Sequence, residues 1–271
     1  MDALEFAAFH EAALECDEIR NNILLSILAR LRTLPEGSGI KFWTLGGPGA
    51  CAAQTPGYPV ILGNLTKEQC QRLAEMLSDA DYPGVVGADE TTLWFTERAR
   101  ECGAEFVEEI PQDIWARHKS CLVPSAAGYP RRPSPKDFPL FKAWTHAFIR
   151  DAIPSDPVPS DNALMVDLRS RRHWFWICED KPVSMAALTR RTRSVAFINA
   201  VYTPPAYRNR GFGAAITAIV VREIFDERRR AAALYVDLRN PASNRCYAKL
   251  GFTPVCKSWL IIRSKRNHPL K

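Results

Sequence analysis

Residues 195–213 read VAFINAVYTPPAYRNRGFG, and the order of residue types in this stretch decides the fold. The first nine residues, 195–203, are mostly β-branched, aromatic or small, which predicts a buried strand. Pro204 and Pro205 end that strand, because proline has no N–H to donate to a ladder. From Phe212 onward, apolar residues recur at intervals of three and four, which predicts a helix. This apolar stripe consists of Phe212, Ala215, Ile216, Ile219, Val220 and Ile224.

The turn between strand and helix reads Arg208-Asn209-Arg210-Gly211-Phe212-Gly213 and has the composition of an anion site. Unpaired N–H groups and the positive end of the helix dipole meet there, beside two arginines. The glycines let a ligand approach the backbone closely. The turn does not fit the Rossmann fingerprint, whose third glycine would fall at Ile216, and it lacks the Gly-Lys-Ser/Thr end of a Walker A loop.

A second motif follows downstream. Ala232 to Leu238 reads as a strand, and residues 240–252 read NPASNRCYAKLGF. Pro241 is typical of a helix start and Gly251 of a helix end, so a short helix is predicted between them. The two motifs resemble the GNAT superfamily of N-acetyltransferases, with its Arg-x-x-Gly-x-Gly pyrophosphate turn and its Asn-x-x-Ser-x-x-x-Tyr-x-x-x-Gly-Phe segment. The resemblance covers residues from about 125 to 265.

The resemblance implies that the chain uses acetyl-CoA as acetyl donor, without a metal. Tyr247 matches the family position that gives a proton to the departing thiolate; packing between helix and sheet is the alternative role. Asn240 and Ser243 would steady the pantetheine arm or begin the helix. Backbone N–H groups near Val201 and Tyr202, where the family's strand has a bulge, would bind the thioester carbonyl. The residues expected to bind acetyl-CoA are Val201, Tyr202, Thr203, Arg208, Asn209, Arg210, Gly211, Phe212, Gly213, Ala214, Asn240, Ser243 and Arg245.

The sequence defines the general base and the acceptor site less well than the acetyl-CoA site. Many relatives carry a glutamate in the central strand, where this chain has Phe197 and Asn199. Water relayed to Glu179, Asp237 or His173 is the remaining option. Four aromatic residues are candidates to line the acceptor site, with burial in the core as the alternative: Trp144, His146, Trp174 and Trp176.

The composition is that of a globular protein: 46% of the 271 residues are hydrophobic and 24% are charged. The first residues lack the basic region of a signal peptide, and no apolar run approaches the roughly 20 residues that cross a bilayer. The eight cysteines show no Cys-x-x-Cys spacing, which favours thiols in a reducing cytoplasm over disulfides or zinc.

Charge divides the chain unevenly. Residues 1–120 hold 10 basic and 19 acidic residues, a net charge of −9, whereas residues 121–271 hold 26 and 11, a net charge of +15. This asymmetry predicts two domains, a 1–120 amino-terminal domain and a 121–271 catalytic domain, joined by a linker at about 124–139. The basic half suits the phosphates of coenzyme A. Nucleic-acid binding is disfavoured, because no recognised binding motif accompanies the charge.

The amino-terminal half is predicted to be a degenerate copy of the same fold. Its first residues read as helices at 2–15 and 18–32 and strands at 41–45 and 60–62. The order that follows, helix 66–77, strand 84–87, helix 90–102, Gly103 and strand 104–115, repeats the order around the acetyl-CoA motif. The Arg-x-x-Gly-x-Gly turn is missing, so this copy is not expected to bind acetyl-CoA. It is expected instead to buttress the catalytic domain or to wall off its acceptor cleft.

The remaining segments complete the expected catalytic domain. A first strand is expected around 121–125, helices at 137–152 and 161–169, and paired strands at 173–178 and 183–189. The fold class is therefore α/β (mixed α+β): a GNAT fold with a mixed, mostly antiparallel sheet flanked by helices, present as a tandem pair. The expected function is acetyl transfer to a primary amine of a small molecule, amino acid or peptide. The alternative is an acetyl-CoA-binding sensor or scaffold, and the sequence leaves open whether the chain forms a homodimer.

Overall fold

The computed structural model describes residues 2–31, 39–88 and 90–264. They form two compact units. Unit 1 combines the described residues up to Ile114 with Asp237–Arg239 and with those from Val255 onward; unit 2 consists of Trp115–Val236 and Asn240–Pro254.

The sheet of unit 2 has the strand order β10-β9-β8-β7-β6. Only β10 and β9 pair in parallel; the pairs β9–β8, β8–β7 and β7–β6 are antiparallel. The mixed, mostly antiparallel sheet expected from the sequence is confirmed. The strands are β6 (Tyr129–Arg131), β7 (His173–Cys178), β8 (Lys181–Arg191), β9 (Val195–Tyr202) and β10 (Ala231–Asp237).

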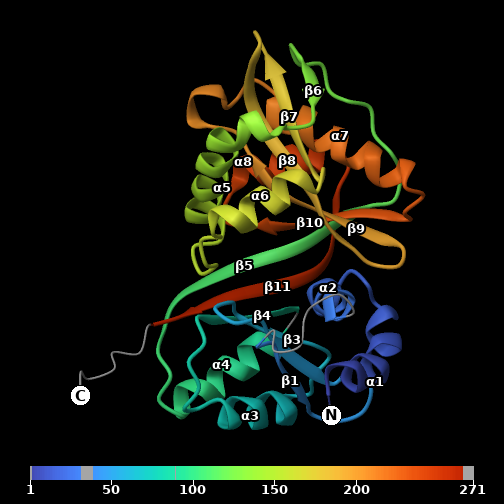
Figure 1. Ribbon diagram of the computed structural model, residues 1–271. Helices are drawn as coiled ribbons and strands as arrows, with labels where there is room; N and C mark the ends of the chain where they lie inside the picture. Colours follow the sequence, from blue (N-terminus) through green and yellow to red (C-terminus); the bar gives the residue numbers. More distant parts are fainter. Residues whose placement is uncertain (1, 32–38, 89, 265–271) are drawn as a thin grey trace. The chain divides into compact units, whose positions relative to one another are not determined.

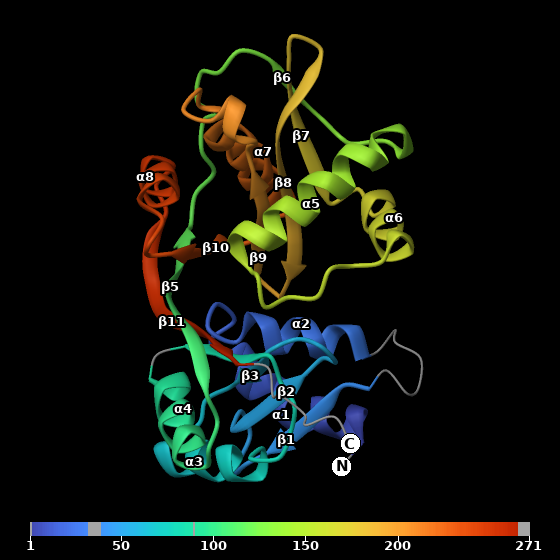
Figure 2. The same ribbon diagram turned by 90° about the vertical axis from the view of Figure 1, so that its left-hand side faces the viewer.

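Helices cover both faces of this sheet (Figure 2). Helices α5 (Phe138–Ala152) and α6 (Asp161–Arg169) share one apolar core with the sheet, and α7 (Phe212–Asp226) and α8 (Pro241–Lys249) share another. Successive side chains of a strand point to opposite faces. Ala196 and Ile198 belong to the core of α7, so Phe197 between them faces the side of α5 and α6.

The strands of unit 1 follow the order β1-β2-β3-β4-β11-β5, and most of them are labelled in Figure 1. Strands β3 and β4 pair in parallel on either side of α3 in the sequence, as β9 and β10 do around α7. The order strand, helix, strand, helix, strand thus occurs twice. Its elements are α1 (Ala3–Glu15), α2 (Asn22–Leu31), β1 (Lys41–Thr44), β2 (Cys51–Gln54), β3 (Val60–Leu62), α3 (Lys67–Met76), β4 (Gly84–Ala88), α4 (Thr91–Glu101), β5 (Phe106–Arg117) and β11 (Thr253–Arg263).

The last strand of the chain completes unit 1. From Ser258 to Ile262, β11 pairs antiparallel with β4, and Ile261 is fully buried in the core of that unit. Gly84 allows this close approach, since a Cβ there would lie 2.4 Å from the Ile261 carbonyl oxygen. A strand that follows the 240–252 motif in sequence is therefore part of the amino-terminal core.

Some expected elements differ from the structure. No strand forms at 121–125; the first strand of unit 2 is β6, at Tyr129–Arg131. Helix α2 begins at Asn22 and not at residue 18, and the expected end at residue 32 lies outside the described residues. Strand β2 was not expected, because its sequence Cys-Ala-Ala-Gln has no β-branched or aromatic residue.

Candidate functional site

The site begins at a bulge in β9. Met185 and Ala187 of β8 stand opposite Tyr202 and Asn199, so β9 carries one residue more than β8 over this span. Ala200 has φ +50, and its N–H donates to the Asn199 side-chain oxygen at 2.8 Å. A β-bulge of this kind bends its strand away from regular pairing.

Strands β9 and β10 also separate here. Their parallel register runs from Val195↔Ala231 to Phe197↔Ala233 and stops there, although β9 continues to Tyr202. Backbone groups beyond the bulge, at Val201 and Tyr202, are therefore not paired with β10 within this register. This is the position at which the resemblance predicts the backbone N–H groups that would bind the thioester carbonyl.

The turn after β9 leads into a helix start that has no side-chain cap. Asn209 and Gly211 adopt left-handed backbone angles, with φ +62 and +82, and Gly211 is the N-cap of α7. The first N–H groups of a helix have no intrahelical acceptor and carry a positive partial charge. A Cβ on Gly211 would lie 4.0 Å from the Ala126 Cβ and from the Ser125 carbonyl oxygen, which is an ordinary van der Waals distance, so no atom crowds the turn at this position.

The expected cofactor residues of the turn lie together around this helix start. Arg208 is exposed and donates from Nε to the Thr203 carbonyl oxygen at 3.0 Å. The exposed Arg210 lies over the Phe212 ring, 4.9 Å from its centroid. The Thr203 hydroxyl lies 2.8 Å from that of Ser184, and would be 3.3 Å from a Cβ on Gly213. Ala214 follows in the first turn of the helix.

The corresponding helix start in unit 1 is already closed by its own side chains. Thr66 caps α3 in a capping box with Gln69, with bonds of 3.3 and 2.9 Å. Glu68 in the first turn adds a negative charge at the positive end of the helix dipole. This capping box leaves α3 unsuited to a diphosphate.

Tyr247 lies on α8, in the same core cluster as Phe212. The residue is 9% exposed, and burial raises the pKa of its phenol. Its hydroxyl has no hydrogen-bond partner among the described residues, and it is not one of the fully buried polar atoms either. The phenol is thus kept protonated with its O–H available.

The remaining motif residues fix the start of α8. The Asn240 side chain accepts from the Ser243 N–H at 3.2 Å, which makes Asn240 the N-cap. Ser243 is half-buried and Arg245 is exposed. The helix ends before Gly251, which has φ +79.

The four candidate acceptor aromatics do not share one surface. Trp144 packs against Phe175 and Tyr202 on the side of α5 and α6. Trp174 and Trp176 face the other side, toward α7. His146 lies on α5 with a buried Nε2 that has no partner among the described residues.

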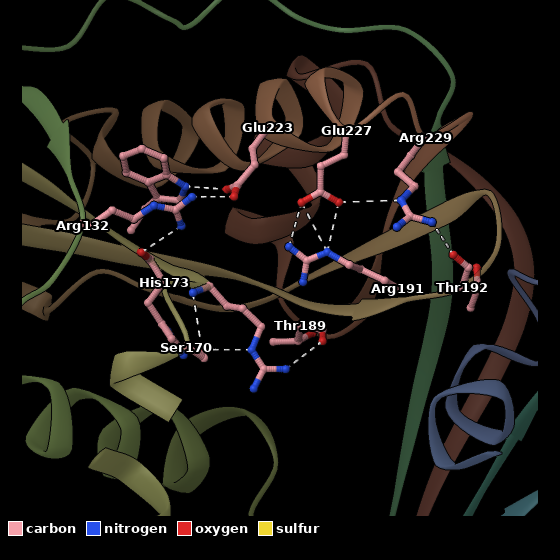
Figure 3. A network of polar contacts seen from close by, with 11 residues as sticks. Arg132, Ser170, His173, Thr189, Arg191, Thr192, Glu223, Glu227 and Arg229 are labelled. Carbon is pink, nitrogen blue, oxygen red and sulfur yellow. Dashed lines mark hydrogen bonds and ion pairs between the residues drawn. The ribbon is translucent and has the colours of Figure 1, made fainter. Parts of the chain in front are cut away.

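Glu223 and Glu227 of α7 belong to a polar network, shown in Figure 3, that ties α7 to the rest of unit 2, and Trp174 is bonded to Glu223. Its indole N–H donates to Glu223 at 2.6 Å, and the Arg132 guanidinium pairs with the same carboxylate at 2.5 Å. Arg132 also stacks on the Trp174 ring, 3.8 Å from its centroid. Farther along α7, Glu227 pairs with Arg191 of β8 at 2.7 Å. These contacts give Trp174 a structural role.

The three candidate bases lie in different elements of the structure. His173 is 3% exposed and its Nε2 bonds to Asp167 at 2.8 Å. Glu179 lies in the exposed β7–β8 turn, and Asp237 accepts from Arg239 at 3.1 Å. The structure instead places an unexpected pair, Asp156 and Arg190, on the α5 side of the sheet, where each influences the pKa of the other.

Two further features of the described residues concern membrane-spanning helices and groups of metal ligands. Among them, no helix combines the length and the apolar character that crossing a membrane requires. Nor do three or more of their His, Cys, Asp or Glu side chains gather as metal ligands would. All eight cysteines are described, and all are free thiols.

Known structures share this fold. A putative acetyltransferase of the GNAT family from Novosphingobium aromaticivorans is 17% identical with a TM-score of 0.56, over 90% of this chain and 97% of its own. A GCN5-related N-acetyltransferase from Kribbella flavida is 16% identical with a TM-score of 0.63, over 92% and 95%. A tandem GNAT protein from the clavulanic acid biosynthesis pathway is 12% identical with a TM-score of 0.54, over 90% and 89%.

The comparisons by sequence match only one part of the chain. No curated protein matches the chain. Residues 139–252, which include both motifs, match the model of the Acetyltransferase (GNAT) family. The expected tandem GNAT fold is confirmed, and the match over residues 139–252 identifies this segment as a GNAT acetyltransferase domain.

Proposed function

We propose that unit 2 binds acetyl-CoA and transfers its acetyl group by direct attack to a primary amine of a small molecule, amino acid or peptide. The observation that carries this proposal is the uncapped start of α7, directly after a bulged strand that has parted from its parallel neighbour. The diphosphate would lie on the N–H groups from Gly211 onward, flanked by Arg208 and Arg210. The thioester would lie beside the bulge.

Each part of the site has a distinct task in this proposal. The N–H groups near Val201 and Tyr202 hold the thioester carbonyl and stabilise the charge that develops on its oxygen. Tyr247 gives a proton or a hydrogen bond to the departing thiolate. Because burial raises the pKa of its phenol, Tyr247 stays protonated and can donate a hydrogen bond to the thiolate as it forms. Unit 1, with its capped α3, takes a supporting role.

The cellular setting is proposed from the cysteines. Eight free thiols are typical of a protein that works in a reducing compartment. We place the enzyme in the cytoplasm, where acetyl-CoA and an amine acceptor meet.

Calorimetric titration of acetyl-CoA tests the site. The wild type is expected to bind in the micromolar range, and Gly211→Trp is expected to lose that binding, because its side chain fills the space over the turn. Gly103→Trp is the matched control: Gly103 is also exposed, with φ +85 and no atom within 4 Å of a Cβ, but it lies in unit 1.

The control should bind as the wild type does. A folded wild type that binds no coenzyme A would overturn the proposal. Binding without release of free thiol in the presence of amines would instead support an acetyl-CoA sensor or scaffold.

A further inference from the structure

Ser184 of β8 is a buried polar residue beside the end of β9, with an exposed fraction of 0%. Its hydroxyl donates to the Tyr202 carbonyl oxygen at 3.1 Å and lies 2.8 Å from the Thr203 hydroxyl. A serine hydroxyl has one hydrogen, so with that hydrogen given to Tyr202 it accepts the hydrogen of Thr203. This buried hydroxyl therefore holds two consecutive residues of the segment that leads from the bulge to the anion turn.

These bonds lie on the face of the sheet that α7 covers. Ala186 and Leu188 belong to the α7 core, and side chains two residues apart on a strand share a face, so Ser184 points to that side as well. The Thr203 hydroxyl lies on the same side, because a Cβ on Gly213 of α7 would be 3.3 Å from it. Ser184 thus joins β8 to the end of β9 beside the first turn of α7.

The bond to Tyr202 sets the direction of the next backbone N–H. Met185 of β8 stands opposite Tyr202, whose carbonyl oxygen is held by Ser184, so this carbonyl points toward β8. In a planar trans peptide the carbonyl and the following N–H point in opposite directions, and the described residues contain no cis peptide bond. The Thr203 N–H therefore points away from β8. Since β9 lies between β8 and β10, this N–H faces the side from which β10 has parted.

The Thr203 N–H is also an unused donor. It has no acceptor among the described residues, whereas the Thr203 carbonyl oxygen accepts from the Arg208 Nε at 3.0 Å. Thr203 is half-buried, and a backbone N–H without a protein partner there is available to a ligand or to water. In the sequence it lies between the bulge proposed for the thioester and the turn proposed for the diphosphate. The part of acetyl-CoA between these two groups is the pantetheine arm, whose amide carbonyls accept hydrogen bonds.

We propose that Ser184 is a positioning residue for the pantetheine arm: it holds the Tyr202–Thr203 peptide so that the Thr203 N–H donates to an amide carbonyl of the arm. The inference rests on the proposed acetyl transfer and adds to it a residue of the neighbouring strand β8. Ser184 is buried and acts through Thr203. An N–H that is already aimed at its acceptor loses less conformational freedom when the ligand binds.

The test compares two ligands that differ in the arm. Acetyl-CoA carries the pantetheine arm, whereas its phosphoadenosine diphosphate fragment carries the diphosphate and lacks the arm. In calorimetric titrations, Ser184→Ala is expected to weaken acetyl-CoA binding by about fivefold or more, the usual weight of one hydrogen bond, and to leave binding of the fragment unchanged. Ser184→Thr, which keeps the hydroxyl, should retain most of the affinity for acetyl-CoA.

Thr192→Val is the matched control. The Thr192 hydroxyl is also buried and donates to a carbonyl of β9, that of Val195 at 3.1 Å, but it lies at the opposite end of the strand. Its removal should lower the melting temperature, as Ser184→Ala does, and change the affinity for neither ligand. This control separates the direction of the Thr203 N–H from the general loss of a buried hydrogen bond.

Thr203→Val gives a second readout that leaves Ser184 in place. It removes the hydroxyl that donates to Ser184, keeps a branched side chain of similar size, and should also weaken acetyl-CoA binding more than fragment binding. If Ser184→Ala does not fold, Thr203→Val carries the same comparison. Equal weakening of both ligands, or no change in either, would overturn the inference while leaving the anion site in place. A wild type that binds neither ligand would overturn the proposed function and the inference with it.

Discussion

Tyr247 can be tested by removing a single oxygen atom. Tyr247→Phe keeps the buried ring and its contact with Phe252, 6.2 Å between centroids, and removes only the proposed proton donor. We expect kcat to fall by about 10² or more, the usual contribution of a general acid, with acetyl-CoA affinity unchanged. Steady-state kinetics and titration on the same preparation measure both. Tyr129→Phe, on the exposed edge strand β6, is the control.

An unchanged kcat in Tyr247→Phe would assign Tyr247 to packing alone. That result would leave the departing thiolate to take its proton from water. It would not affect the anion site at the start of α7.

At the residue scale, the sequence predicts the residues of the turn and of α8 better than it predicts the pair Asp156 and Arg190. The turn residues and the α8 residues come from contiguous motifs, and short-range backbone rules place them. Asp156 and Arg190 are 34 residues apart in the sequence and have no fixed spacing. They meet only because the β8–β9 register, which shifts between Leu188 and Arg190, turns Arg190 toward the α5–α6 loop.

At the scale of elements, the entry to α5 depends on one carboxylate. Asp137 accepts two bonds from Arg131, at 2.8 and 2.9 Å, and two from Ser134, at 2.6 and 2.8 Å. These donors, with the Arg131 guanidinium first, lower the pKa of Asp137 to about 2. They join strand β6 to the start of helix α5.

Asp137→Asn is therefore expected to lower the free energy of unfolding by about 2 kcal/mol at pH 7. A carboxylate whose pKa is lowered in the folded state stabilises the fold at pH values above its unfolded pKa, which is near 4. This stabilisation is lost as the pH falls through the folded-state pKa of about 2. The difference from the wild type should thus shrink between pH 4 and pH 2 in urea titrations. Asp161→Asn, from an exposed pair with Lys142, should cost less than about 1 kcal/mol. A difference that does not vary with pH would contradict the ionic explanation.

Local physical reasons explain why some elements were not predicted correctly from the sequence. Strand β6 contains Pro130, which is tolerated because β6 is the last strand of the sheet. Its pairing with β7 outweighs the better β-propensity of residues 121–125. Strand β2 is stabilised by burial between β1 and β3, which propensity cannot detect.

At the scale of the whole molecule, one strand belongs to a different unit from the one that its place in the sequence predicts. The predicted boundary between residues 120 and 121 places β11 with the catalytic domain, whereas the described residues from Val255 onward belong to unit 1. Repetition of the helix and strand order reveals the tandem pair. It cannot reveal which unit receives the last strand, because both copies end in a strand at the corresponding place.

The contribution of β11 to unit 1 can be measured with two fragments. Residues 1–120 alone leave the β4 edge without its partner and expose core that Leu260 and Ile261 cover, at 5% and 0% exposure. An open, apolar strand edge favours aggregation. We expect this fragment to lack a cooperative thermal transition. The same fragment extended by a flexible linker and residues 253–264 should recover one, whereas an extension carrying Ile261→Lys should not. If residues 1–120 melt cooperatively at the same temperature with and without the added strand, β11 is dispensable for unit 1.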